Sequence, residues 1–520
     1  MGIAEIAVLT CDRPARLARV LDGYATVVDH RAPPEQLTVF DDSSCPEIRA
    51  ENARVLREIE RHRGTPIWYV GPIERQRFVR RLEQAGFPPD VLEFGLLGRS
   101  WNERTVGCNR NAVLLESAGR LLLSVDDDTD AAVRPSPALK PGLRLATLAE
   151  RATDPVFPCD LWTYDTHDAV RNDGSWRADG VLAVHERLLG RTAQACVAEF
   201  AARNEPVRVD AVAPAAFAAR LAPRRIVVTL SGLAGDCGWR SPAPYLWLRD
   251  RSLGQLTRSA EHYRAACGTR TVLRVAESYA VVDRSMNMMG TFFGLDNTQI
   301  APPFPPIGRG QDVVFGVLAG ACVPDACFGH VPWAMPHEPV ESRQFRARDV
   351  VSAALGTDLC VVTTAVVLAL SADLPVDDAG ASMQMLGRRL AALGSDSFEH
   401  ADACIRSAVM RLVGEQFAAL ERQLHGGQTA APFWAADARH ALELWKRAGR
   451  HAGYHVPVEC LKNTDLRGGM ERTVAYLRQF GRLLEQWPGI VRASIALRES
   501  GGGLAIPTRS NALRGKDGIA

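Results

Sequence analysis

The strongest constraint on the fold is an alternation of short apolar runs and helical stretches over the first 130 residues. Four apolar runs have the length and composition of buried strands, at residues 3–10, 37–40, 67–70 and 120–125. Three stretches repeat apolar residues at helical spacing, at residues 14–28, 47–63 and 109–118. Because strands joined by single helices pack as right-handed βαβ units, the sequence predicts an α/β fold. We expect a Rossmann-like, mainly parallel mixed sheet with flanking helices.

Acidic residues follow two of these strands. Asp41-Asp42 ends the second, and Asp126-Asp127-Asp128 follows the apolar run RLLLSV. Carboxyl ends of parallel strands meet at one edge of a sheet, where ligands bind, so both groups should border one crevice. Three adjacent carboxylates repel one another unless a cation compensates, and Mg²⁺ or Mn²⁺ suits such oxygen ligands. Asp41-Asp42 could equally cap the next helix or accept the N–H of a pyrimidine base.

Beyond residue 341 the pattern becomes helical. Apolar residues recur at helical spacing at residues 381–393, 399–424, 436–452 and 469–484. We therefore expect an α/β domain over residues 1–340, with an insertion at 131–290, followed by a mostly helical domain over 341–500 and a flexible tail over 501–520. A homodimer is expected over a monomer.

Composition argues against several functional classes. Lys plus Arg number 61 against 60 Asp plus Glu, so no overall field holds the chain on nucleic acid or an anionic membrane. The 12 cysteines form no CxxC pair, which is typical of reduced thiols in a cytoplasmic protein, and no signal peptide is recognisable. Residues 350–370 nearly match a membrane span, but Asp358 near the centre opposes insertion, so a buried helix or strand is expected.

Four segments carry a family resemblance. They are TCDRP near the N-terminus, VFDDSS after the second strand, CNRNAVLLESAGRLLLSVDDDTD around the fourth strand, and PPFPPIGRGQDVVFG later in the chain. In this order they resemble the signature of inverting, family 2-type glycosyltransferases with a GT-A fold, over about residues 1–340. The resemblance implies a Mn²⁺- or Mg²⁺-dependent enzyme that transfers a sugar from a nucleotide-diphosphate donor. Gln311 stands where the family usually has Glu.

The resemblance also implies roles for individual residues. The nucleotide sugar would be held by Thr10, Arg13, Asp41, Arg104, Asp126 and Asp127. Asp128 would bind the divalent metal, and His337 in WAMPHEP would complete the metal site, with His330 as the competing candidate. Asp312 would be the catalytic base that deprotonates the acceptor. Arg99 and Arg110 approach the same crevice from the segment before the acidic strand.

Other interpretations stay open at this point. A non-catalytic binding or assembly protein could keep the same fold, and a sugar nucleotidyltransferase is less favoured because TCDRPARL lacks the glycine-rich loop of those enzymes. The acceptor could be a peptide, glycan, lipid or small molecule, and the helical domain is a candidate for binding it or for self-association. The aromatic side chains of Trp239, Tyr245 and Trp247 could stack on a sugar or pack in the core.

Overall fold

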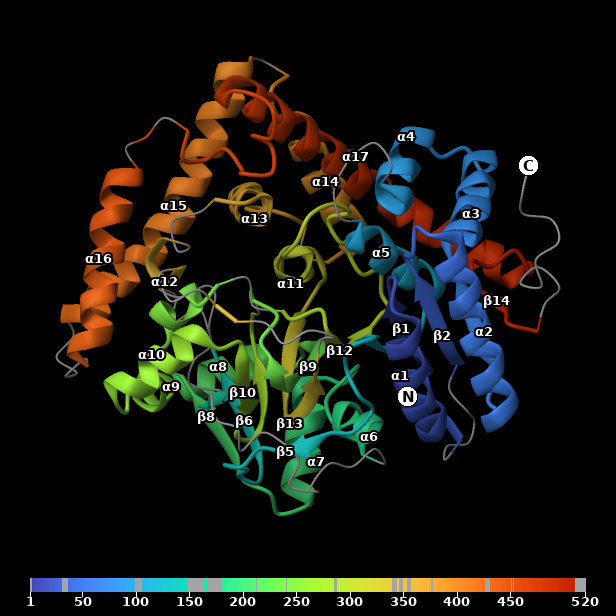
Figure 1. The fold of residues 1–520 in the computed structure, drawn as a ribbon, viewed down its shortest axis with the longest axis horizontal. Coiled ribbons are helices and arrows are strands. Elements are labelled where there is room, and N and C mark those ends of the chain that lie inside the picture. Colours follow the sequence, from blue (N-terminus) through green and yellow to red (C-terminus); the bar gives the residue numbers. More distant parts are fainter. Residues whose placement is uncertain are drawn as a thin grey trace.

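The computed structural model defines the backbone over most of the chain. It describes residues 2–29, 36–98, 105–147, 162–165, 180–211, 213–239, 241–284, 288–338, 344–345, 349–352, 357–375, 377–395, 397–425, 431–449, 451 and 453–509. Within these residues the fold is α/β, with one mixed sheet and helices on both sides (Figure 1). The predicted α/β class is confirmed.

The N-terminal half of the sheet is parallel, as the alternation predicted. Its strands are β1 (Glu5–Thr10), β2 (Gln36–Asp41), β3 (Ile67–Val70) and β4 (Leu121–Asp126), in the spatial order β3-β2-β1-β4. The helices between them are α1 (Pro14–Asp29), α2 (Pro46–Arg63), α3 (Pro72–Gln84), α4 (Pro89–Leu92), the π-helical turn η1 (Glu93–Leu97) and α5 (Val106–Glu116). Every residue of β1 is buried, which explains the apolar run at residues 6–9.

Beyond β4 the sheet is mixed rather than mainly parallel. β12 (Phe292–Asp296) pairs antiparallel with both β4 and β9 (Arg225–Asp236), and β9 pairs parallel with β13 (Ala326–His337). The path ends with β11 (Tyr279–Val282), β6 (Leu143–Ala146) and β8 (Val207–Asp210), while β5 (Arg134–Pro135), β7 (Trp162–Asp165) and β10 (Thr271–Ala276) pair beside it. Much of the expected insertion at 131–290 thus adds strands to the same sheet.

Helices of the middle segment cover this mixed part of the sheet. They are α6 (Val181–Glu186), α7 (Ala193–Ala202), α8 (Pro214–Leu221), the 3-10 turn η4 (Ala243–Trp247), α9 (Asp250–Leu256), α10 (Ala260–Gly268) and α11 (Gln311–Cys322). Tyr245 is fully buried and packs edge-to-face on Trp239, and Trp247 packs on Phe417 of the C-terminal helices. These three aromatic residues therefore pack in or against the core.

The C-terminal segment is helical and shares its core with the sheet. It forms α12 (Asp349–Ser352), α13 (Leu359–Leu370), α14 (Ala379–Ala391), α15 (Phe398–His425), α16 (Pro432–Ala448) and α17 (Leu466–Glu499). Buried residues of these helices belong to the same continuous apolar cluster as those of the N-terminal strands. Figure 1 shows α17, in red, reaching the N-terminal half of the sheet. Trp487 Nε1 of this helix donates to the carbonyl of Ala301, in the segment between β12 and α11, at 2.8 Å.

Two expectations about the C-terminal part are resolved in the structure. Asp358 is the N-cap of α13, accepting a hydrogen bond from the Val361 amide at 2.9 Å. No helix among the described residues has the length and hydropathy of a membrane span. Within the tail expected to be flexible, β14 (Ile506–Pro507) instead pairs antiparallel with β3, which corrects that prediction for these residues; residues 510–520 lie outside the described part.

Candidate active site

The predicted acidic groups lie at one edge of the sheet. In the parallel register Thr10 of β1 lies beside Asp41 of β2, and Leu9 lies beside Asp126 of β4. The chain then turns at the ends of β1 and β4, so the loops that begin at Cys11 and Asp127 face each other. The βαβ arrangement therefore brings the two acidic segments into one region, as the sequence predicted.

Asp127 is held by the first loop. Thr10 Oγ1 donates to Asp127 Oδ2 at 2.8 Å, and Arg13 Nη1 donates to Asp127 Oδ1 at the same distance. Arg13 also reaches Asp128 Oδ2 at 3.3 Å. Asp127 is buried, which raises its pKa, while the Arg13 charge opposes that rise. Thr10 and Asp127, both expected to contact the donor, thus bind each other and orient Arg13.

Asp128 pairs with His337. The two are brought together by an antiparallel bridge between Thr129 and His337, and His337 Nε2 lies 3.3 Å from Asp128 Oδ1. Both side chains are largely buried, with exposed fractions of 10% for Asp128 and 6% for His337. Burial alone would raise the pKa of Asp128, but the hydrogen bond and charge of His337, helped by Arg13, hold it at about 2.

The ring of His337 is oriented by the end of β9. Its Nδ1 donates to the backbone carbonyl of Asp236, which leaves Nε2 directed at Asp128. Gly235 makes this approach possible: its φ is +123°, and a Cβ there would lie 2.3 Å from the His337 carbonyl oxygen. The Asp236 side chain is fixed in turn by Arg270, whose Nη2 donates to Asp236 Oδ1 at 2.9 Å.

The donor set at Asp128 and His337 suits a divalent cation. Apart from the 3.3 Å contact with His337 Nε2, the buried Asp128 Oδ1 has no hydrogen-bond partner among the described residues. Adjacent ligands of an octahedral ion with bonds of about 2.1 Å lie about 3.0 Å apart, close to the 3.3 Å between Asp128 Oδ1 and His337 Nε2. The described residues contain no group of three or more His, Cys, Asp or Glu side chains arranged for a metal. Water or phosphate oxygens would have to complete such a shell, as is usual for Mg²⁺.

Asp126 is paired on the opposite side from Arg13. Arg110 Nη2 donates to Asp126 Oδ1 at 2.8 Å, and the Asp126 amide donates to the Thr291 carbonyl at 2.9 Å. Burial, opposed by Arg110 and reinforced by the two neighbouring carboxylates, raises the pKa of Asp126 to about 7. Its side chain is 30% exposed, so it remains open to a ligand.

Asp312 lies next to this group through the segment that precedes β12. It stands in the first turn of α11, and its Oδ2 accepts a hydrogen bond from the Gly290 amide at 2.8 Å. Since Thr291 binds the backbone of Asp126, two consecutive residues connect Asp312 with Asp126. The structure therefore places the predicted base at the same edge of the sheet as the acidic triplet.

The Asp41-Asp42 pair divides into a fully buried and a partly exposed residue. Asp41 is fully buried, and its oxygens accept from the Ser43 amide at 2.8 Å, Asn52 Nδ2 at 2.9 Å and Tyr69 Oη at 3.0 Å. This placement gives Asp41 an internal structural role instead of the expected contact with the donor. The sequence could not separate the two aspartates, because they differ only in which face of the strand end they occupy.

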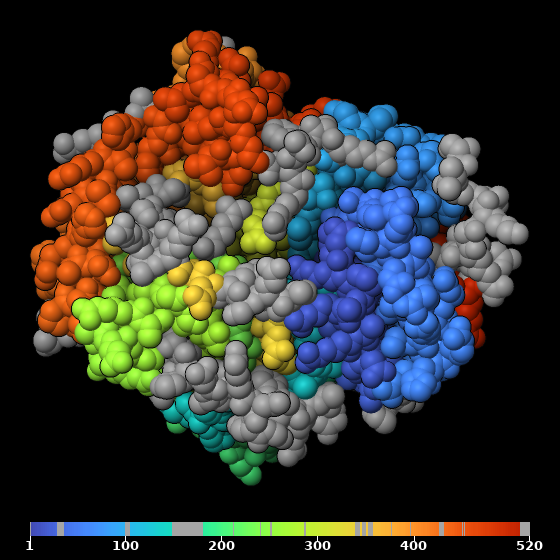
Figure 2. Space-filling model, in the orientation of Figure 1, coloured from blue at the N-terminus to red at the C-terminus, as the bar shows by residue number. Residues whose placement is uncertain are grey.

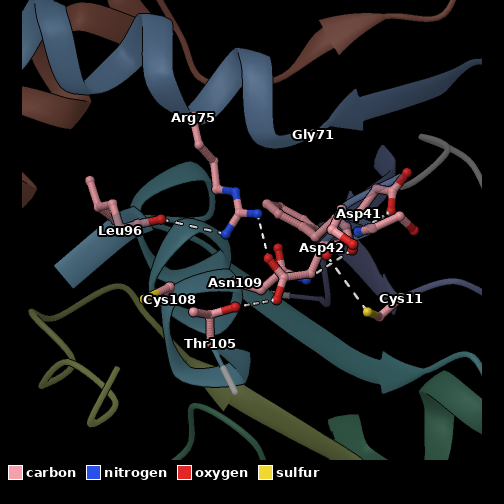
Figure 3. Close-up of polar contacts among 12 residues, drawn as sticks. Cys11, Asp41, Asp42, Gly71, Arg75, Leu96, Thr105, Cys108 and Asn109 are labelled. Carbon is pink, nitrogen blue, oxygen red and sulfur yellow. Dashed lines mark hydrogen bonds and ion pairs between the residues drawn. The ribbon is translucent and has the colours of Figure 1, made fainter. Parts of the chain in front are cut away.

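Asp42 points toward the loops at the sheet edge (Figure 3). Arg75 Nη2 binds Asp42 Oδ1, and Thr105 Oγ1 donates to Asp42 Oδ2 at 2.8 Å. Arg75 is almost completely buried in α3, whereas Asp42 is partly exposed. Sequence reasoning missed Arg75, since an arginine in a charged helix resembles any surface residue.

Of the remaining candidate residues, two lie outside the described part of the chain and one, His330, does not join this site. Arg104 lies outside the described residues, as does Arg99. His330 is buried in the middle of β13, where burial lowers its pKa to about 3, and it pairs with Ala280 of β11. It is therefore separated along β13 from His337, the histidine that reaches the acidic triplet.

The sequence analysis also missed Asp236, although its position at a strand end was a usable signal.

No family model, no curated protein and no solved structure matches the chain.

Proposed function

We propose that this protein is a divalent-metal-dependent glycosyltransferase that uses a nucleotide-diphosphate sugar and inverts the configuration at the transferred carbon. One observation carries the proposal: the buried pair formed by Asp128 and His337, 3.3 Å apart, lies at the carboxyl end of a parallel strand. A nucleotide sugar brings two phosphate charges to such a site, and parallel α/β sheets bind nucleotides at this edge. A bound cation would neutralise charge on the departing diphosphate.

The residues around this pair supply complementary functions. Arg13 lies against Asp127 and Asp128 with its side chain 37% exposed, so it can contact a phosphate oxygen without losing its anchors. Asp126 presents a partly exposed carboxylate that can accept a ribose hydroxyl. Asp42, rather than Asp41, has a carboxylate near the surface where the N–H of a base could bind.

Asp312 is proposed as the general base. Its carboxylate takes the proton of the acceptor hydroxyl while the acceptor oxygen forms a bond to the sugar carbon. The bond from that carbon to the diphosphate oxygen breaks, and the nucleoside diphosphate leaves with the electron pair. A base positioned in this way contributes about 10²–10⁴-fold to the rate. The backbone amide of Gly290 holds the carboxylate in place.

A thermal-shift screen tests this function directly. UDP-, GDP- and dTDP-sugars are added with and without Mn²⁺, and hydrolysis of each donor is followed in parallel. Binding at a hundred times Kd stabilises the folded state by about 2.7 kcal/mol. A Mn²⁺-dependent shift with slow donor hydrolysis supports the proposal. Absence of both across the donor panel contradicts it.

A non-catalytic binding protein is the second candidate, and one observation favours it. Arg13, Arg110 and a proton on His337 can together balance the charges of Asp126, Asp127 and Asp128. This triplet therefore does not require a cation to be tolerated in the fold. Nucleotide-dependent stabilisation that is independent of metal and accompanied by no turnover would support this candidate over the enzyme.

A further inference from the structure

Three consecutive buried residues of α5 each bind a different part of the site. They are Asn109, Arg110 and Asn111, with exposed fractions of 3%, 3% and 0%. Asn109 Nδ2 donates at 2.9 Å to the carbonyl of Phe40 in β2. Phe40 is the residue before Asp41. Buried polar side chains of this kind persist where their partners must be held in place.

Asn111 fixes the segment that leads into α11. Its Nδ2 donates to the Phe304 carbonyl at 3.0 Å, and its Oδ1 accepts from the Phe304 amide at 2.7 Å. Phe304 in turn stacks on Phe315 of α11, with ring centroids 4.1 Å apart. The helix that carries Asp312 is therefore connected to α5 through two hydrogen bonds and a ring stack.

Arg110 lies between the carboxylates of Asp126 and Asp312. Its guanidinium pairs with Asp126 at 2.8 Å and lies about 6 Å from the ring centres of Phe293 and Phe304. Its Nε and Nη1 are buried without a hydrogen bond to any residue in the described ranges. Packing on the rings and a single ion pair thus set the position of this charge.

Gly290 fills the remaining space between Arg110 and Asp312. A Cβ at Gly290 would lie 3.1 Å from the guanidinium carbon of Arg110 and 3.2 Å from Asp312 Cβ. The Gly290 amide also donates to Asp312 Oδ2 at 2.8 Å. Arg110 therefore touches Asp126 on one side and the glycine that binds Asp312 on the other.

We propose that Arg110 is a positioning residue that fixes the carboxylate of Asp126 relative to that of Asp312, with Gly290 as the spacer between them. The inference rests on the proposed glycosyltransferase function, in which these carboxylates serve the donor and the acceptor. A displacement of about 1 Å between reacting groups can cost about a hundredfold in rate. The fold thus couples the two halves of the reaction through one buried guanidinium.

Two variants test this role. Arg110→Lys keeps the positive charge but loses the planar fork and its packing on the rings. Gly290→Ala adds one methyl group between Arg110 and Asp312 and leaves both side chains present. The matched controls are Arg120→Lys, whose arginine pairs with Glu5 at the opposite edge of the sheet, and Gly320→Ala, whose new methyl would have its nearest neighbour at 3.8 Å.

The measurement is kcat and KM for Mn²⁺-dependent hydrolysis of whichever donor stabilises the unmodified protein. For Gly290→Ala we expect kcat to fall about 10- to 100-fold, with KM for the donor changed less than about threefold because the donor contacts remain. For Arg110→Lys we expect a fall in kcat and a smaller thermal stabilisation of the protein by the donor. Hydrogen exchange of peptides that cover residues 288–295 should become faster in Arg110→Lys and stay unchanged in Arg120→Lys.

The outcomes separate this inference from the proposed function. If the unmodified protein shows neither donor stabilisation nor turnover, the glycosyltransferase proposal fails, and the role assigned to Arg110 fails with it. If the unmodified protein is active and Gly290→Ala has the kcat of Gly320→Ala, the function stands and the positioning role is overturned. Should Arg110→Lys not fold, Gly290→Ala alone decides the result.

Discussion

His337 Nε2 lies 3.3 Å from Asp128 Oδ1, and each side chain shifts the pKa of the other. Burial opposes the protonated form of His337, but the hydrogen bond and charge of Asp128 raise its pKa above the ordinary value. Without a cation, a proton on His337 balances Asp128. With a cation bound, His337 must be neutral, so metal and proton compete for one position.

This competition predicts a pH-dependent metal affinity. Because the pKa of His337 is raised, Mn²⁺ must displace a proton below that pKa, and its affinity should increase with pH by up to about tenfold per unit. Calorimetric titration of Mn²⁺ from pH 6 to 8 measures the slope. In His337→Gln we expect weaker binding and a flatter slope, and an equal slope in both proteins would contradict the assignment of His337 as a ligand.

The same pair predicts a pH window for stability without metal. A raised histidine pKa gives stability that is complete below about pH 6.5 and is lost as the pH rises through the folded pKa. The pKa of Asp128, held at about 2, gives stability that is present above about pH 4 and is lost as the pH falls toward 2. We therefore expect Asp128→Asn to destabilise most between about pH 4 and 6.5, by about 3 kcal/mol. Urea unfolding of both proteins across pH tests this, and a difference independent of pH would argue against the pairing.

Substitution of the proposed base should separate binding from chemistry. Asp312→Asn keeps an oxygen that can accept from the Gly290 amide but cannot take a proton. We expect the donor-dependent thermal shift to remain and the transfer rate to fall about 10²–10⁴-fold. Transfer at the unmodified rate would remove Asp312 from the mechanism.

Asp41 should matter for stability and not for the donor. In the unmodified protein Asn52 Nδ2 and Tyr69 Oη donate to the carboxylate of Asp41. In Asp41→Asn an amide group, which itself carries N–H donors, replaces that carboxylate. Leaving such buried groups unsatisfied should lower the free energy of unfolding by about 3 kcal/mol. Chemical denaturation measures this loss. Nucleotide affinity, measured well below the unfolding temperature, should stay unchanged; a selective loss of affinity would return Asp41 to the binding site.

Gly235 should be intolerant of a side chain. Gly235→Ala combines a φ of +123° with a methyl group 2.3 Å from the His337 carbonyl oxygen, so we expect a loss of about 1–3 kcal/mol of stability and a reduced Mn²⁺ response. Gly254→Ala is the control, since a Cβ there has no neighbour within 4 Å. Thermal unfolding with and without Mn²⁺ compares the two variants, and similar behaviour would show that His337 does not depend on Gly235.

Some features of the site were predictable from local sequence alone. The strand before Asp126 is apolar except for Ser124, which predicted that the triplet follows a buried strand, and parallel strands place such ends together. The proximity of Asp312 and His337 to that triplet entered only through the family resemblance. Neither the pattern nor the resemblance separated Asp41 from Asp42, or identified Arg75 and Asp236.

The sequence by itself determined the α/β class and the strand ends at which carboxylates gather, because the spacing of apolar residues follows the buried faces of strands and helices. Tertiary structure decided which carboxylates are satisfied inside the protein and which face a ligand. That choice depends on partners far away in the chain: Tyr69 and Asn52 enclose Asp41, Arg13 holds Asp127, and the end of β13 brings His337 to Asp128. Such pairs form only when the strands of the mixed sheet assemble, because hydrogen bonds act over a few ångströms. The partners lie far apart in the chain, so no local sequence pattern predicts them.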